Sequence, residues 1–209
     1  MAVQTVPTKG NLLATKKSLE LSRTGFELLD RKRNILIREM MALIDRAASI
    51  QDKIDTTYAQ AYKALQMANI ASGICYEVSR TVPVESGLNV AFRSVMGVEI
   101  PMVSLTEHNA PIPYGLSSTN SMMDRAYERF NEVKRLTAEL AEVENSVYRL
   151  ADAIKKTQKR ANALKNIMIP RFEETVKFIT DALEEKDREE FSRLKVIKSQ
   201  KTAKSQKNA

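Results

Sequence analysis

The sequence predicts an all-α fold: a long antiparallel two-helix coiled coil whose N- and C-terminal helices flank a small central β-hairpin and loop segment. Proline is absent from residues 8–82, and glycine is absent from residues 26–72. From residue 116 onward the chain has one proline, Pro170, and no glycine. Most of the prolines instead fall within residues 83–115. Since these two residue types interrupt helices, the chain divides into helix, break and helix.

A heptad repeat predicts the N-terminal helix over residues 9–79. Counting from Leu12, apolar or small side chains fill most a positions as far as Cys75 and most d positions as far as Val78. One register therefore persists for about ten heptads, which is typical of a left-handed supercoil. Both helices and the segment between them are expected to form a single elongated domain, residues 1–209.

A second repeat predicts the C-terminal helix over residues 122–194, with a and d positions that start at Val133 and Leu136. The apolar spacing changes at residues 168–176, where steps of four predict a stutter around Pro170. The remaining residues, 195–209, carry lysines without an apolar stripe, so we expect a disordered basic tail. The short connection between the two helices requires them to pack antiparallel.

The connecting segment, residues 80–121, changes to a near-alternating pattern of apolar residues. This pattern predicts a β-hairpin that turns at Met96 and Gly97. Pro101 confines its strand to a sheet edge, because proline lacks the backbone N–H that a central strand needs. We expect an irregular loop to follow.

The composition indicates a coiled-coil protein of the cytoplasm. Of the 209 residues, 6% are aromatic and none is Trp, which argues against a thick globular core. The single cysteine, Cys75, allows no internal disulfide. The sequence also lacks the features of a signal peptide and has no apolar run long enough to insert into a membrane.

The net charge of +7 is concentrated in two places, a predicted basic collar and the lysine-rich C-terminal tail. Antiparallel pairing places residues 31–38 beside residues 153–165, and neither stretch contains an acid. A solvated helical face is one interpretation; the other is an electrostatic bearing surface for acidic groups on a partner. The collar consists of Arg31, Lys32, Arg33, Arg38, Lys155, Lys156, Lys159, Arg160 and Lys165.

An aromatic stripe outside the helix seam is the second candidate surface. Tyr58, Tyr62 and Leu65 share one helical face, whereas the seam beside them is built from alanines. The stripe is interpreted as a docking site for another protein chain, or alternatively as a surface that packs on the irregular segment of the same chain.

The sequence offers no catalytic site, metal site or cofactor site. His108 is the only histidine, which excludes His-based triads and multi-histidine metal sites. The segment from Gly10 to Ser18 departs from a phosphate-binding loop at Thr15, and no strand precedes it. We therefore expect a protein that is not itself an enzyme.

Several short motifs, taken in order, resemble the D-subunit family of the V-type and A-type rotary ATPases. They include Gly25 with Leu28–Leu29, Val95–Met96–Gly97–Val98 with Pro101, and Tyr114–Gly115. They continue with residues 160–164 before Pro170 and end with residues 184–195. Each motif alone is weak, whereas their order and spacing over about 190 residues are specific.

The resemblance implies a central rotor shaft that couples ATP hydrolysis or synthesis to proton or sodium transport. Its implied partners are the catalytic and non-catalytic head subunits (A and B), the small rotor partner (the F subunit) and the socket subunit (C or d) above the membrane ring. It also implies that the collar bears on the head and that the Tyr58 stripe holds the F subunit. A coiled-coil arm that binds nucleic acid, or a scaffold, is the alternative that charge and shape alone allow.

Overall fold

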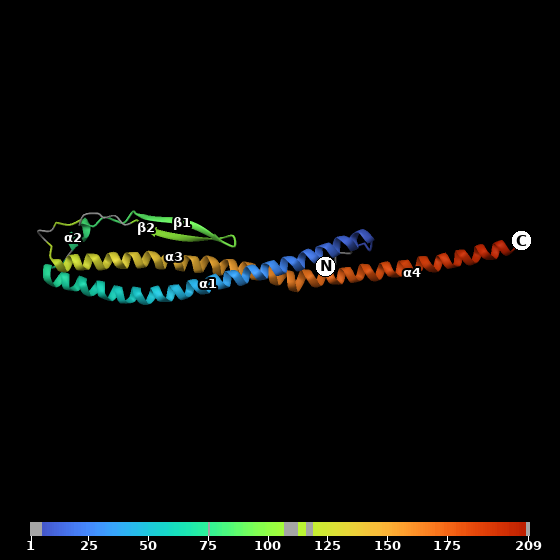
Figure 1. Cartoon of the computed structure of the whole chain (residues 1–209), viewed down its shortest axis with the longest axis horizontal. Coiled ribbons are helices and arrows are strands. Elements are labelled where there is room, and N and C mark those ends of the chain that lie inside the picture. Colours follow the sequence, from blue (N-terminus) through green and yellow to red (C-terminus); the bar gives the residue numbers. More distant parts are fainter. Residues whose placement is uncertain (1–5, 75, 107–112, 116–118, 208–209) are drawn as a thin grey trace. The chain divides into compact units, whose positions relative to one another are not determined.

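The computed structural model describes residues 6–74, 76–106, 113–115 and 119–207. It confirms the predicted fold class (Figure 1), with long helices before and after one small hairpin along the chain. Cys75 and His108, together with most of the expected return loop, lie outside the described residues. In chain order the elements are α1 (Lys9–Ser72), α2 (Tyr76–Thr81), β1 (Leu88–Val95), β2 (Val98–Leu105), α3 (Ser121–Ala163), the π-helix η1 (Leu164–Met168) and α4 (Ile169–Lys207).

The first helix ends earlier than the heptad repeat predicts. At its start, the Thr8 hydroxyl accepts the N–H of Asn11 at 3.2 Å and so caps α1. At its end, Gly73 takes a positive φ of 82° and donates its N–H to the Asn69 carbonyl. Glycine adopts this conformation without steric cost, which makes Gly73 a helix stop. The expected range 9–79 is therefore wrong at its C-terminal end, where residues 76–81 form the separate helix α2.

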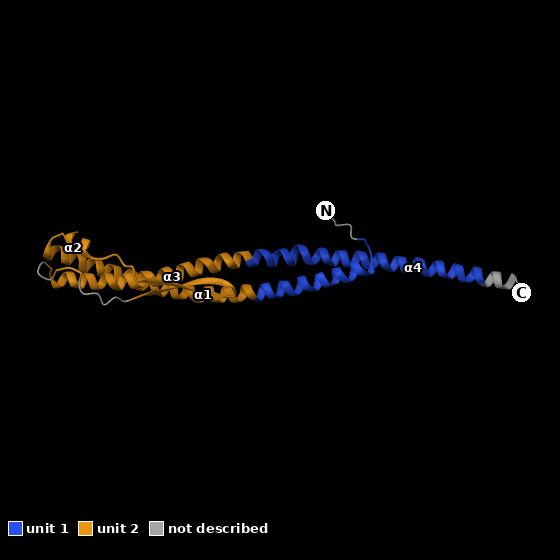
Figure 2. Cartoon of the chain, turned by 90° about the horizontal axis from the view of Figure 1, so that it is seen from above, with its two compact units in different colours: residues 1–31, 157–209 blue, residues 32–156 orange. Residues whose placement is uncertain are grey.

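The chain divides into two compact units (Figure 2). Unit 1 consists of residues 1–31 and 157–209, and unit 2 consists of residues 32–156. The helix α1 and the helix α3 each contribute to both units. Unit 2 contains the whole hairpin and the helix α2.

In unit 1, a π-helical turn precedes Pro170. The N–H of Ile169 reaches the Leu164 carbonyl, five residues back, which widens the helix at η1. Proline has no N–H and its ring crowds the carbonyl four residues earlier, so the wider turn relieves that clash. On the facing segment of α1, a Cβ placed on Gly25 would lie 3.8 Å from the Leu164 side chain. The irregularity thus begins earlier than the expected stutter at residues 168–176.

The end of α4 also differs from the expectation. Residues 195–207 continue the helix, whereas the sequence led us to expect disorder after residue 194. No glycine or proline follows Pro170, and Lys, Gln and Ala are strong helix formers. Nothing in this segment therefore ends the helix, even though it has no apolar stripe.

In unit 2, α1 and α3 lie side by side and share a buried seam (Figure 1). One cluster joins Ile50 and Ile54 of α1 to Val143 of α3. A second joins Leu36 of α1 to Leu150 of α3, and both of these side chains are fully buried. These are a or d positions of the repeat, so the predicted seam is the observed core of this unit.

The hairpin turns at Met96 and Gly97, as the sequence predicts. Both residues have positive φ, 51° and 76°, which matches a two-residue type I′ turn. The two strands pair from Val95 opposite Val98 to Leu88 opposite Leu105. Ile100 of β2, which is 2% exposed, inserts into the cluster of Leu36 and Leu150.

Side chains of α3 complete the outer edge of β2. The Glu142 carboxylate accepts the Val103 N–H at 2.6 Å, and the Arg149 guanidinium donates to the Glu99 carbonyl at 3.3 Å. Between them, the Ser146 hydroxyl lies 3.5 Å from the Pro101 carbonyl. Proline at this position leaves no N–H that the helix would have to satisfy. Pro101 is thus at an edge, but at an edge that α3 covers.

None of the helices in the described ranges is long and apolar enough to cross a membrane.

Replacing Ile100 by alanine should remove the contact that fixes the hairpin on the helices. For Ile100→Ala we expect a loss of about 2–4 kcal/mol in the free energy of unfolding, since the cavity left between Leu36 and Leu150 cannot close fully. Urea denaturation followed by circular dichroism measures the change.

Met102→Ala is the matched control, because Met102 lies on the same strand and is exposed. It should cost less than about 1 kcal/mol. Equal losses for the two variants would contradict a hairpin anchored through Ile100.

Candidate functional site

Five residues of the basic collar lie in unit 2. Lys32 and Arg33 are half-buried, and Arg38, Lys155 and Lys156 are exposed. The Arg33 guanidinium donates to the Asn34 side-chain oxygen at 3.1 Å. Lys156 pairs with Asp152 at 2.8 Å across one helical turn. Asp152 lies just before the acid-free stretch 153–165 and neutralises part of its charge. This part of the collar is therefore less basic than the sequence suggested.

The other four collar residues lie in unit 1. Arg31, Lys159 and Arg160 are exposed, and the Lys165 ammonium lies 5.7 Å from the centre of the Phe26 ring. Exposed ammonium and guanidinium groups are suited to meeting carboxylates of a partner. The structure describes each group within its own unit, and a single continuous collar stays a prediction.

The aromatic stripe of α1 divides into a packed part and an open part. Tyr58 packs against the cluster of Ile50, Ile54 and Val143. Its ring stacks on that of Tyr62, with centroids 6.0 Å apart. Tyr62 in turn meets the ring of Phe130 on α3 edge-on at 5.7 Å, yet its side chain remains 54% exposed. Tyr62 is therefore the member of the stripe that is available to a partner.

Leu65, the third member, lines a mostly apolar cavity of about 390 Å³ inside unit 2. Val78 and Val82 line it from the segment after α1, and Tyr127 and Phe130 line it from α3. Leu65 thus shares a cavity with residues that follow α1 in its own chain, and its role in docking another chain stays a prediction. The ion pair of Lys134 with Glu85, 2.6 Å long, borders the same cavity.

Tyr114, at the wall of this cavity, was not identified from the sequence as a structural residue. Its hydroxyl donates to the Asp124 carboxylate at 2.8 Å, and its ring meets that of Tyr127 edge-on. Burial, together with the hydrogen bond to Asp124, raises the pKa of Tyr114 well above its usual range. The phenol therefore stays neutral and holds the chain just before α3 against that helix.

The hairpin contacts the helices through an ion pair and a cation–π contact, and it also exposes apolar side chains. Arg93 reaches Glu39 of α1 at 2.8 Å, and the Arg149 guanidinium lies 5.5 Å from the centre of the Phe92 ring. Val90 and Phe92 of β1 nonetheless remain about half exposed. Met96 at the turn is also exposed, so the hairpin presents an apolar outer strand beside its predicted turn.

Other polar contacts between the two helices of unit 2 were likewise not found from the sequence. Arg46 of α1 pairs with Glu139 of α3 at 2.6 Å. The hydrogen bond from Arg46 to Glu139 raises the pKa of Arg46 above its ordinary value. Heptad counting identifies apolar seam positions, whereas such flanking pairs depend on the register between the two helices.

Within the part of the chain that the structure describes, no group of three or more His, Cys, Asp or Glu side chains could hold a metal ion. The predicted collar and stripe consist mainly of cationic and aromatic side chains on helices. Such groups can bind a partner.

The family comparison covers nearly the whole chain. A model of the family described as the D subunit of ATP synthase matches residues 11–199. The V-type ATP synthase D subunit of Thermotoga neapolitana is 44% identical over 194 residues, which cover 92% of this chain and 96% of the relative.

Archaeal relatives agree with this match. The A-type ATP synthase D subunit of Thermococcus kodakarensis is 38% identical over 198 residues, covering 92% of each chain. That of Methanobrevibacter smithii is 37% identical over 198 residues, covering 92% of this chain and 86% of the relative. With a family match over residues 11–199 and relatives aligned over most of their own length, the chain belongs to the ATP synthase D-subunit family.

Proposed function

We propose that this chain is the central rotor subunit of a V-type or A-type ATPase, and that it transmits rotation between the catalytic head and the membrane ring. The observation that carries the proposal is the family match across residues 11–199, which includes both long helices and the hairpin. In this role the chain couples ATP hydrolysis or synthesis to proton or sodium transport. In this proposal the chain hydrolyses nothing itself and acts by binding the other subunits.

A rotor has to transmit torque without coming apart, and the packing of unit 2 supports this role. Buried clusters join α1 to α3 at Leu36 and at Ile50. The hairpin is held on the same helices by the ion pair of Arg93 with Glu39 and by the hydrogen bond from the Val103 N–H to the Glu142 carboxylate. Close-packed contacts of this kind switch between discrete arrangements and do not deform continuously.

The head is proposed to respond because a helical pair is asymmetric about its axis. As it turns, it presents different side chains to each catalytic subunit in succession. A face of the rotor shifts the equilibrium between two conformations of a catalytic site only if it contacts those two conformations differently. The proposed partners are the A and B subunits of the head, the F subunit and the socket subunit (C or d), with the chain peripheral to the membrane.

Cross-linking tests the rotor role directly. Leu13, on the part of α1 in unit 1, is exposed and accepts a cysteine without loss of core. The cysteine of the Leu13→Cys variant is joined by a disulfide bond to a cysteine on a head subunit. The complex should then lose nearly all ATP-driven ion transport and regain it when the disulfide is reduced. Transport that continues through the cross-link would show that this chain does not turn.

The collar should contribute to insertion into the head. Reversing the charge at Arg31, Lys32, Arg33, Lys159 and Arg160 to Glu should lower the yield of assembled complex several-fold at low salt. Added salt should reduce that loss, because it screens the new repulsion. Co-purification with the A and B subunits at two ionic strengths measures the effect.

Reversal of Lys195, Lys198, Lys201, Lys204 and Lys207 is the matched control. It changes the charge by the same amount at the end of the chain, where no binding role is proposed. If assembly falls equally in both variants, net charge and not the collar governs insertion.

The exposed tyrosine of the stripe should hold the F subunit. Tyr62→Ala should weaken co-purification of the F subunit by about tenfold or more, as the loss of aromatic anchors at interfaces commonly does. Tyr148→Ala is the control, since Tyr148 is an exposed tyrosine on α3 of the same unit. Retention of the F subunit by Tyr62→Ala would place its site elsewhere.

A further inference from the structure

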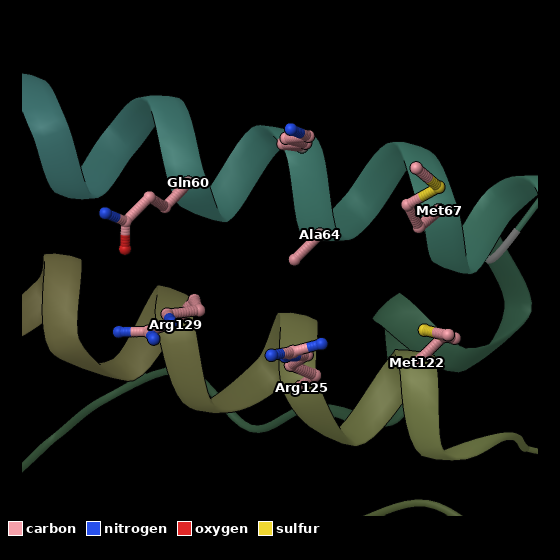
Figure 3. Close-up of a pocket in the computed structure, with 7 residues that line it drawn as sticks. Gln60, Ala64, Met67, Met122, Arg125 and Arg129 are labelled. Carbon is pink, nitrogen blue, oxygen red and sulfur yellow. The ribbon is translucent and has the colours of Figure 1, made fainter.

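A second cavity of unit 2, about 370 Å³ in volume, opens between α1 and α3 and is lined mainly by cations and methionines (Figure 3). Gln60 and Ala64 point from α1 toward α3, and Arg125 and Arg129 lie one turn apart on the facing helix. Its volume falls within the range of sites that bind small molecules. Neither the heptad repeat nor the family match explains why it is basic.

The charge around this cavity is unbalanced. Lys63, Arg125 and Arg129 line it, and none of the lining residues is an acid. Arg129 has a partner in Glu132 at 2.9 Å. Lys63 and Arg125 have no ion pair among the residues that the structure describes. Because like charges one turn apart on a helix repel each other, an anion bound here would reduce the repulsion between Arg125 and Arg129.

The floor of the cavity is apolar. Ala64 and Met67 supply it from α1, and Met122 supplies it from the first turn of α3. Met67 and Met122 are each about half exposed, so their thioethers are available to a ligand. Methionine is flexible and polarisable, and it adapts to aliphatic groups of varied shape.

We propose that this cavity binds a phosphate ester that carries an aliphatic chain. The phosphate lies between Arg125, Arg129 and Lys63, and the aliphatic part lies over Ala64, Met67 and Met122. A phosphate monoester carries about two negative charges and three strong acceptor oxygens, which suits a cavity lined by three cations. Two arginines one turn apart can each present a fork of N–H donors to such a group.

The lining also argues against other small anions. A simple carboxylate offers one charge to three cations, and inorganic phosphate leaves the methionine floor uncovered. No aromatic side chain lines the cavity, so nothing there would stack on a nucleotide base. A soluble aliphatic phosphate and phosphatidic acid, the phospholipid whose headgroup is a phosphate monoester, share the required chemistry.

Methionine NMR on the full chain tests the proposal. With ¹³C-methyl methionine, octyl phosphate should shift the signals of Met67 and Met122 saturably and leave that of Met168 in unit 1 unchanged. Met67→Leu and Met122→Leu assign the two signals. Inorganic phosphate should bind at least about tenfold more weakly, because it cannot cover the apolar floor.

Substituting the cations of the cavity distinguishes binding at this site from general electrostatic attraction of the ligand to a basic chain. Arg125→Gln with Arg129→Gln should weaken octyl phosphate binding by about tenfold or more, and Lys63→Gln should weaken it several-fold. The matched control, Arg171→Gln with Lys177→Gln, removes two cations from unit 1 and should leave binding unchanged. Circular dichroism checks that each variant keeps its helical content.

A vesicle experiment identifies the source of the phosphate. Co-sedimentation with vesicles that contain phosphatidic acid, absent with phosphatidylcholine vesicles and lost in the double arginine variant, would identify a membrane lipid. Octyl phosphate binding without co-sedimentation would identify a soluble ester.

Two outcomes would overturn the proposal. The first is equal affinity for octyl phosphate and for inorganic phosphate. The second is the absence of a saturable shift with octyl phosphate, together with failure of the double arginine variant to assemble with other ATPase subunits. The cations would then face an acidic protein surface.

Discussion

The architecture of unit 2 depends on the contact among Leu36, Ile100 and Leu150, which joins both long helices and the hairpin at one point. Burial of three large aliphatic side chains favours this arrangement. Once Ile100 is inserted, β2 lies close enough to α3 for Glu142 and Arg149 to reach its backbone. The polar contacts then fix the orientation of a hairpin that two strands alone would hold only weakly.

The seam changes in character along unit 2, and the candidate surfaces follow that change. Large aliphatic residues fill it near Leu36 and Ile54, whereas Ala61, Ala64 and Ala68 occupy it further along α1. In the alanine-rich part, the larger side chains lie beside the seam. There Tyr62 contacts Phe130, and a basic cavity opens over Ala64. The change from large aliphatic residues to alanines along the seam thus accounts both for the close-packed core near Leu36 and for the surfaces available to partners near Ala64.

Much of the fold follows from local pattern, because heptads and turns are encoded by neighbouring residues. The heptad positions predict α1 and α3, and the pair Met96 and Gly97 predicts the turn where it occurs. The end of α1 was missed because the repeat continues past Gly73, whose positive φ overrides it. The candidate surfaces were predicted less completely. Tyr62 was found by its spacing, but its contact with Phe130 and the packing of Tyr58 depend on the register of two distant helices.

Rotation of this chain relative to the catalytic head is the central claim, and a single-molecule measurement tests it most directly. With Cys75 replaced by serine and a bead attached at Arg80→Cys, the ATPase complex is immobilised through its head. Arg80 is an exposed residue of α2. We predict that ATP drives the bead in one direction, in steps that match the number of catalytic sites. A bead that stays still while the complex hydrolyses ATP would contradict rotation.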